Sequence, residues 1–170
     1  MLSLKQLGLR LLLLSGVTLQ VHAMPPASAD RLDAVAQRGA QVMPFNLEQT
    51  MHHFSKTQMG GIQQVVVKNP QNQVDLSAIQ RHLSSLSTRF SAGDFSGPQS
   101  IHGQDMPGTK MLELNAQRIR FQYQDLALGG QIEMISTEPE LILAIHQFLD
   151  AQLNDHARHA QAGMHAQHHP

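Results

Sequence analysis

Two stretches of the chain repeat one order of hydrophobic and polar positions. Each contains two segments of alternating polarity around a glycine pair: 50–57 and 62–68 around Gly60-Gly61, then 118–124 and 131–137 around Gly129-Gly130. A period of two is typical of half-buried strands. The paired glycines can supply the positive φ that a tight turn needs. Each stretch therefore predicts a β-hairpin.

A helical pattern follows each predicted hairpin. Apolar residues recur every three or four positions: Leu76, Ile79, Leu83, Leu86 and Phe90 in the first, and Leu141, Ile142, Ile145, Leu149 and Leu153 in the second. This spacing keeps one helix face apolar, and Asp75 and Pro139 suit the two helix starts. The sequence therefore predicts an α+β fold in which two β-β-α repeats form a four-stranded antiparallel sheet with two helices on one face.

The remaining segments divide the chain into four parts. Residues 1–23 have the pattern of a signal peptide, and 24–42 that of a leader with a short helix. Residues 43–155 form the single α+β domain, in which a glycine- and proline-rich loop joins the two repeats. Residues 156–170 lack an apolar face, so they are expected to be a disordered, histidine-rich tail.

The first residues predict export. Lys5 and Arg10 precede a short apolar core, which ends at the small-residue site Val21-His22-Ala23. A basic start, a short apolar core and small residues before the cut are the marks of a cleavable signal peptide. No later stretch reaches the roughly 18 apolar residues of a membrane span. A periplasmic or secreted protein without a membrane span after processing is expected.

Composition restricts the chemistry of the chain. Its net charge is −1, which argues against a nucleic-acid partner. It has no cysteine, hence no disulfide, no thiolate metal site and no thiol nucleophile. It also lacks a Gly-x-Ser-x-Gly elbow, a His-Glu-x-x-His helix and a glycine-rich phosphate loop, so no catalytic residue can be named. Eleven histidines remain as the main chemical resource.

Four residues of the expected domain form a candidate metal site: His53, His102, Met106 and His146. Imidazole with thioether is a ligand set that suits copper. Strand alternation places His52 and Phe54 on one face and His53 on the other, so only one of the two neighbouring histidines can join a given site. The sequence predicts a copper or other transition-metal cofactor bound by these four residues.

The tail histidines are predicted to be auxiliary metal collectors: His156, His159, His165, His168 and His169. Histidine-rich tracts bind divalent ions with low specificity. The function predicted is that of an exported protein that binds or traffics a transition metal ion, with a periplasmic protein as a further possible partner. Two alternatives stay open, a non-catalytic ligand or protein interaction module that uses the open sheet face, and heme binding through His53 or His146.

Several motifs together resemble a known family: Met43-Pro44-Phe45, 52–57, 60–66, 90–95, 101–108 and 145–156. These segments are similar to those of small exported bacterial proteins of unknown function, often labelled aspartate carbamoyltransferase. That enzyme uses a Ser-Thr-Arg-Thr loop at a helix start. This chain has Ser87-Thr88-Arg89-Phe90 near the end of a predicted helix, where the free N–H groups that bind phosphate are absent. The sequence therefore argues against carbamoyltransferase activity.

Overall fold

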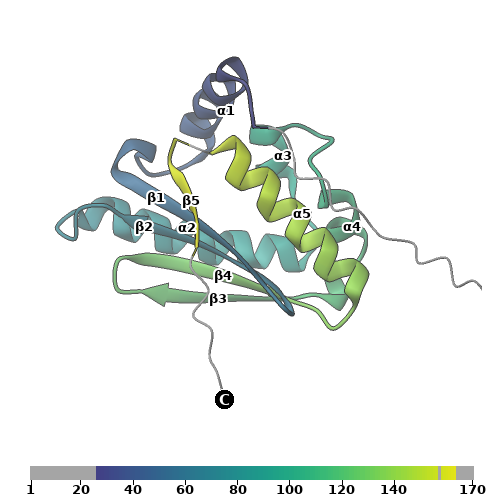
Figure 1. Ribbon diagram of the computed structural model, residues 1–170. Helices are drawn as coiled ribbons and strands as arrows, with labels where there is room; N and C mark the ends of the chain where they lie inside the picture. The colour runs from purple at the N-terminus through teal and green to yellow at the C-terminus, as the bar shows by residue number, and fades with distance from the viewer. Residues whose placement is uncertain (1–25, 157, 164–170) are drawn as a thin grey trace, which may run out of the picture.

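The computed structural model describes residues 26–156 and 158–163 (Figure 1). The predicted signal peptide and His165, His168 and His169 lie outside these residues. The elements in chain order are α1 (Ala29–Val42), η1 (Leu47–Gln49), β1 (Thr50–Thr57), β2 (Gly60–Val67), α2 (Gln73–Ser91), α3 (Ser96–His102), α4 (Thr109–Leu114), η2 (Ala116–Arg118), β3 (Arg120–Leu126), β4 (Gly129–Ile135), α5 (Pro139–Asp155) and β5 (Ala160–Ala162). Within the described residues, no helix has the length and hydropathy of a membrane span.

The fold is α+β, as predicted, but its sheet is larger. The strand order is β3-β4-β2-β1-β5. The first four strands pair antiparallel, and β5 adds to β1 in parallel, so the sheet is mixed and five-stranded. The predicted four-stranded antiparallel sheet is thus the main part of a five-stranded one. Among the described residues, α1 corresponds to the short helix predicted within 24–42, and α3 and α4 are α-helices that were not predicted.

Helices α2 and α5 cover the same face of the sheet. Gln152 of α5 donates a hydrogen bond to Gln63 of β2, which is paired in register with Ile132 of β4. Leu83 of α2 lies over Gly130, two residues from Ile132 on that strand. The apolar stripes of both helices therefore meet the inward side chains of the strands in one core, and Ile132 is fully buried there.

The glycine pairs act differently from the prediction. The hairpin turns lie at residues 58–59 and 127–128, and each glycine pair begins the following strand. Only Gly60 of the four has a positive φ, 141°. A Cβ on Gly129 would lie 1.9 Å from the Val65 main-chain oxygen, and one on Gly61 would lie 2.3 Å from Leu149. The pairs are thus required mainly for close approach of neighbouring elements.

The segment between the repeats and the end of the domain also differ from prediction. The predicted loop contains α3 and ends at α4. The prediction of disorder from residue 156 is wrong for the described part of the tail, because His156 and His159 are buried and β5 pairs with β1. Figure 1 shows α1 and α3 at the end of the sheet where α5 ends and β5 begins. This junction holds the candidate site.

Candidate functional site

Three histidines from distant parts of the chain meet in the interior at this junction: His52 in β1, His102 at the end of α3 and His156 directly after α5. We call these three residues the histidine cluster. They are 1%, 4% and 4% exposed. The ring of His156 is nearly parallel to that of His52, with 5.1 Å between centroids, and edge-on to that of His102, at 4.8 Å. The cluster is therefore closed to solvent and positioned by ring packing.

A buried carboxylate fixes one member of the cluster. The Nδ1 of His102 donates a hydrogen bond to Asp155, the last residue of α5, over 2.9 Å. Arg31 of α1 donates two further hydrogen bonds to the same carboxylate, each 2.6 Å long, and one of 3.1 Å to the main-chain oxygen of His102. Because Nδ1 is the donor, a neutral His102 keeps its lone pair on Nε2.

Four ring nitrogens of the cluster have no hydrogen-bond partner within the described part of the chain. They are both nitrogens of His52, the Nε2 of His102 and the Nε2 of His156. A buried polar atom without a partner costs about 1–3 kcal/mol of stability. Native proteins satisfy nearly all such atoms, so each exception calls for an explanation. Apolar side chains of similar size would fill this space at lower cost.

Burial also keeps two rings of the cluster, those of His52 and His156, uncharged. Desolvation lowers the pKa of His52 to about 3 and the pKa of His156 well below its ordinary value of 6.5. Burial would raise the pKa of Asp155, but the hydrogen bonds from His102 and Arg31 outweigh it, and the pKa is lowered. At neutral pH the site therefore contains two neutral imidazoles with free lone pairs close to an ionised carboxylate.

The structure does not bring the four predicted ligands together. His102 belongs to the cluster, whereas Met106 packs in the hydrophobic core. His53 lies on the opposite face of β1 from His52, because side chains alternate along a strand, and it is only partly buried. The Nε2 of His146 lies 3.0 Å from the main-chain oxygen of Thr57, at the far end of β1. One of the four predicted ligands is thus in the observed cluster.

His52 is the residue that sequence reasoning passed over. Alternation in β1 places it on the face of Phe54, and the face that carries a phenylalanine is the one that meets the core. That signal favoured His52 over His53 for an enclosed site. His156 falls in the predicted tail, but it directly follows α5, and Ala160–Ala162 then pairs with β1.

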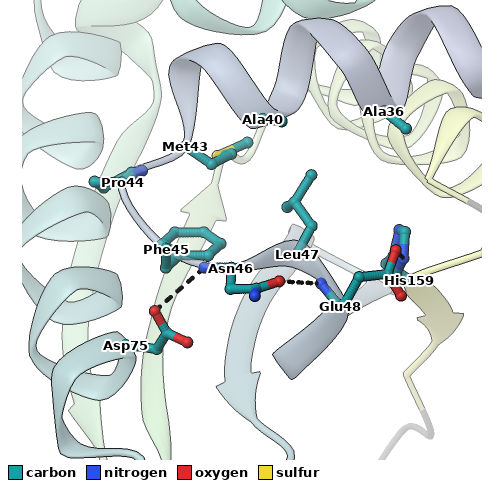
Figure 2. A pocket seen from close by; sticks show the side chains of 10 residues that line it. All are labelled: Ala36, Ala40, Met43, Pro44, Phe45, Asn46, Leu47, Glu48, Asp75 and His159. Atoms are coloured by element: carbon teal, nitrogen blue, oxygen red, sulfur yellow. Dashed lines mark hydrogen bonds and ion pairs between the residues drawn. The ribbon is translucent and has the colours of Figure 1, made fainter.

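A pocket of about 500 Å³ opens beneath α1, near the cluster (Figure 2). Its lining residues are Ala36, Ala40, Met43, Pro44, Phe45, Asn46, Leu47, Glu48, Asp75 and His159. On one side, Glu48 accepts a hydrogen bond of 2.7 Å from the His159 Nε2. On the other side, Asp75 accepts one of 3.2 Å from the Asn46 main-chain nitrogen. The pocket thus has an apolar floor between two carboxylates.

The arrangement of the cluster limits its chemistry. Among residues 26–156 and 158–163, no set of three or more His, Cys, Asp or Glu side chains is arranged to hold a metal ion as it stands. In the same residues, no hydrogen bond joins a cluster ring to a Ser or Thr hydroxyl, so the Asp155–His102 pair lacks the nucleophile of a hydrolytic triad. The cluster can take up protons, or it can donate imidazole lone pairs to a metal ion once its rings turn.

Comparisons with known proteins add no assignment. Searches against protein-family models, curated proteins and solved structures each returned no match. The resemblance to small exported bacterial proteins therefore stays a prediction.

Proposed function

We propose that the chain is an exported transition-metal-binding protein of the copper type, with His52, His102 and His156 as its ligands. The observation that supports this proposal is the set of four buried ring nitrogens without partners. Metal ligation requires the neutral form of imidazole, and burial favours that form. A bound ion would also recover the stability that the unpaired nitrogens cost, which gives their burial a function.

The contact between Asp155 and His102 supports the same proposal. A histidine that ligates a metal commonly donates its other ring N–H to a carboxylate, which fixes the ring and raises its basicity. In this chain Nδ1 of His102 makes that contact and Nε2 is free. Arg31 holds the carboxylate from its other side, so Asp155 is a positioning residue in the proposed site.

The spacing of the rings suits a shared ion. Two imidazoles that bind one ion at about 2.0–2.1 Å with a tetrahedral angle have ring centroids roughly 5 Å apart. The observed centroid distances are 5.1 Å between His52 and His156 and 4.8 Å between His102 and His156. Ligation then needs ring rotation more than backbone movement. The His52 ring can turn without losing a hydrogen bond, because neither of its ring nitrogens makes one.

The donor set narrows the choice of ion. The cluster offers imidazole nitrogen alone, since Met106 lies in the hydrophobic core. Imidazole suits copper, zinc and nickel, and divalent copper binds nitrogen sites most tightly among the first-row metals. The soft thioether that would favour Cu⁺ is missing from the set. Cu²⁺ is therefore the ion with which the proposal is best tested, and Zn²⁺ is the natural competitor.

Replacing His52 with leucine tests the proposal. We expect the His52→Leu protein to bind Cu²⁺ at least about 10-fold more weakly than wild type, because an enclosed site loses one of three ligands. The matched control is His53→Leu, which changes the next residue of β1 on the opposite face and should leave the affinity unchanged. Calorimetric titration measures affinity and stoichiometry, and electron paramagnetic resonance reports the coordinated nitrogens.

Both variants are also made in a chain that ends at Gly163, so that the last histidines cannot hide the result. Equal affinities for wild type and His52→Leu would show that the cluster does not hold the ion. A loss of affinity in His53→Leu would also contradict the proposed ligand set, because His53 lies outside the histidine cluster. If the wild-type protein binds no Cu²⁺ or Zn²⁺, a ligand or protein interaction module becomes the better proposal.

A further inference from the structure

A second, smaller cavity lies between the surface pocket and the histidine cluster. Its volume is about 10 Å³, and its walls are Leu32, Ala36, Leu47, Asp155, His156, Arg158 and His159. Three of these residues, Ala36, Leu47 and His159, also line the surface pocket. The two spaces therefore share part of their walls. The inner cavity reaches His156 and Asp155, so it adjoins the cluster itself.

Glu48 and His159 connect solvent to this inner cavity. The Glu48 side chain is 74% exposed and that of His159 is 10% exposed, with 2.7 Å between their bonded atoms. An exposed carboxylate attracts cations, and imidazole binds transition-metal ions directly. The Glu48 carboxylate can therefore attract a cation. The His159 ring beside it can bind the ion and also lines the inner cavity.

The backbone holds His159 against the cluster. The His159 main-chain oxygen accepts a hydrogen bond from the His52 main-chain N–H over 2.8 Å, and the His159 main-chain N–H donates one to the His156 main-chain oxygen over 2.7 Å. These contacts fix His159 beside two cluster residues. Its ring nevertheless lines the surface pocket and bonds to Glu48 (Figure 2). His159 is therefore held beside the cluster by its main chain and faces the surface pocket with its ring.

We propose that a divalent transition-metal ion reaches the histidine cluster through the pocket beneath α1, where Glu48 and His159 capture it and pass it to His156. The proposal rests on the proposed metal-binding function. Glu48 and His159 act during loading and release and are not final ligands. Their loss should therefore slow both steps and leave the equilibrium affinity unchanged.

Two variants of the full chain test this route by different means. Glu48→Gln removes the charge and keeps the shape of an exposed side chain. Ala36→Met fills the wall shared by the two cavities. We expect the Glu48→Gln protein to bind Cu²⁺ about 10-fold more slowly than wild type. Charges of one sign that line a cleft raise the association rate of an oppositely charged ligand by about 10-fold or more. Ala36→Met should be slow as well, and Gln37→Met, on the exposed side of α1, is its control.

Stopped-flow absorption after mixing with Cu²⁺ measures the rate, and titration of the same proteins measures the affinity. Raised ionic strength should shrink the difference between wild type and Glu48→Gln, because salt screens exposed charges. Wild-type rates in both variants, together with normal affinity, would overturn the route and leave the metal site standing. If Glu48→Gln loses as much affinity as it loses in rate, Glu48 is a ligand of the bound ion. That result would also overturn the proposed route. If wild type binds no Cu²⁺, the metal function fails first, and the route fails with it.

Discussion

A chain that ends at Asp155 is expected to unfold about 10 °C below the full chain. The truncation removes the ring of His156, which packs on His52, together with β5. It also leaves the main-chain N–H of His52 without its acceptor on His159, and it uncovers Phe54. An unpaired buried donor costs about 1–3 kcal/mol, and exposing an aromatic side chain costs a similar amount. Each kcal/mol lowers the Tm of a domain of this length by about 2–4 °C.

The matched control is a chain that ends at Gly163. It keeps β5 and the hydrogen bond from the Gly163 nitrogen to the Phe54 oxygen, 2.9 Å long. We expect it to unfold with the full chain when melting is followed by circular dichroism. Equal midpoints for the chains ending at Asp155 and Gly163 would contradict the structure at this edge of the sheet. They would favour the sequence-based prediction that the tail is disordered from residue 156.

The repeated β-β-α order was predictable because each element buries one face. Burial of that face imposes a period of two on strands and about 3.6 on helices, and both periods are visible in the sequence. β5 was not predictable by this means, because Ala160–Ala162 is short and two of its three residues are exposed. β5 is held by main-chain hydrogen bonds. Every residue type except proline has both the N–H donor and the C=O acceptor that such bonds need. The short helix α3 escaped prediction because Ser96–His102 contains glycine and proline and has no repeating apolar stripe.

The candidate site was predictable only in part. His102 was identified from its glycine- and proline-rich surroundings, but its partners lie far away in the sequence. Arg31 and Asp155 are 124 residues apart and share two hydrogen bonds. The site forms only where the ends of α1, α3 and α5 meet β1, so its composition depends on tertiary packing. Local patterns report burial well, and they do not report which buried residues meet.

Acid is expected to destabilise the metal-free protein steeply between pH 6.5 and 4.5. Burial lowers the pKa of His52 from 6.5 to about 3, and this effect outweighs the contact with the His159 main chain, which would raise the pKa. Below pH 6.5 the unfolded chain binds a proton that the folded chain excludes. The free energy of unfolding therefore falls by about 1.4 kcal/mol per pH unit for this residue, or about 2–3 kcal/mol over the interval.

His156 adds to this loss, because burial also lowers its pKa well below 6.5. Asp155 contributes only at lower pH, since its stabilising charge disappears as pH falls through a folded-state pKa that lies below 3.8. Well above pH 6.5 His52 and His156 are neutral in both states and contribute no pH dependence. The interval from pH 6.5 to 4.5 thus reports on His52 and His156, together with His82, whose pKa burial also lowers. Urea unfolding at several pH values, with a chelator present, measures the slope.

The His52→Leu protein should lose a clear part of this slope and should also be more stable than wild type at neutral pH when no metal is present. Leucine fills a similar volume and removes two buried nitrogens that have no partner. An unchanged slope would show that His52 is hydrated or paired in solution, against the structure. A variant that is more stable but no longer binds Cu²⁺ would show that the histidine is retained for binding at the expense of stability, as is common at functional sites.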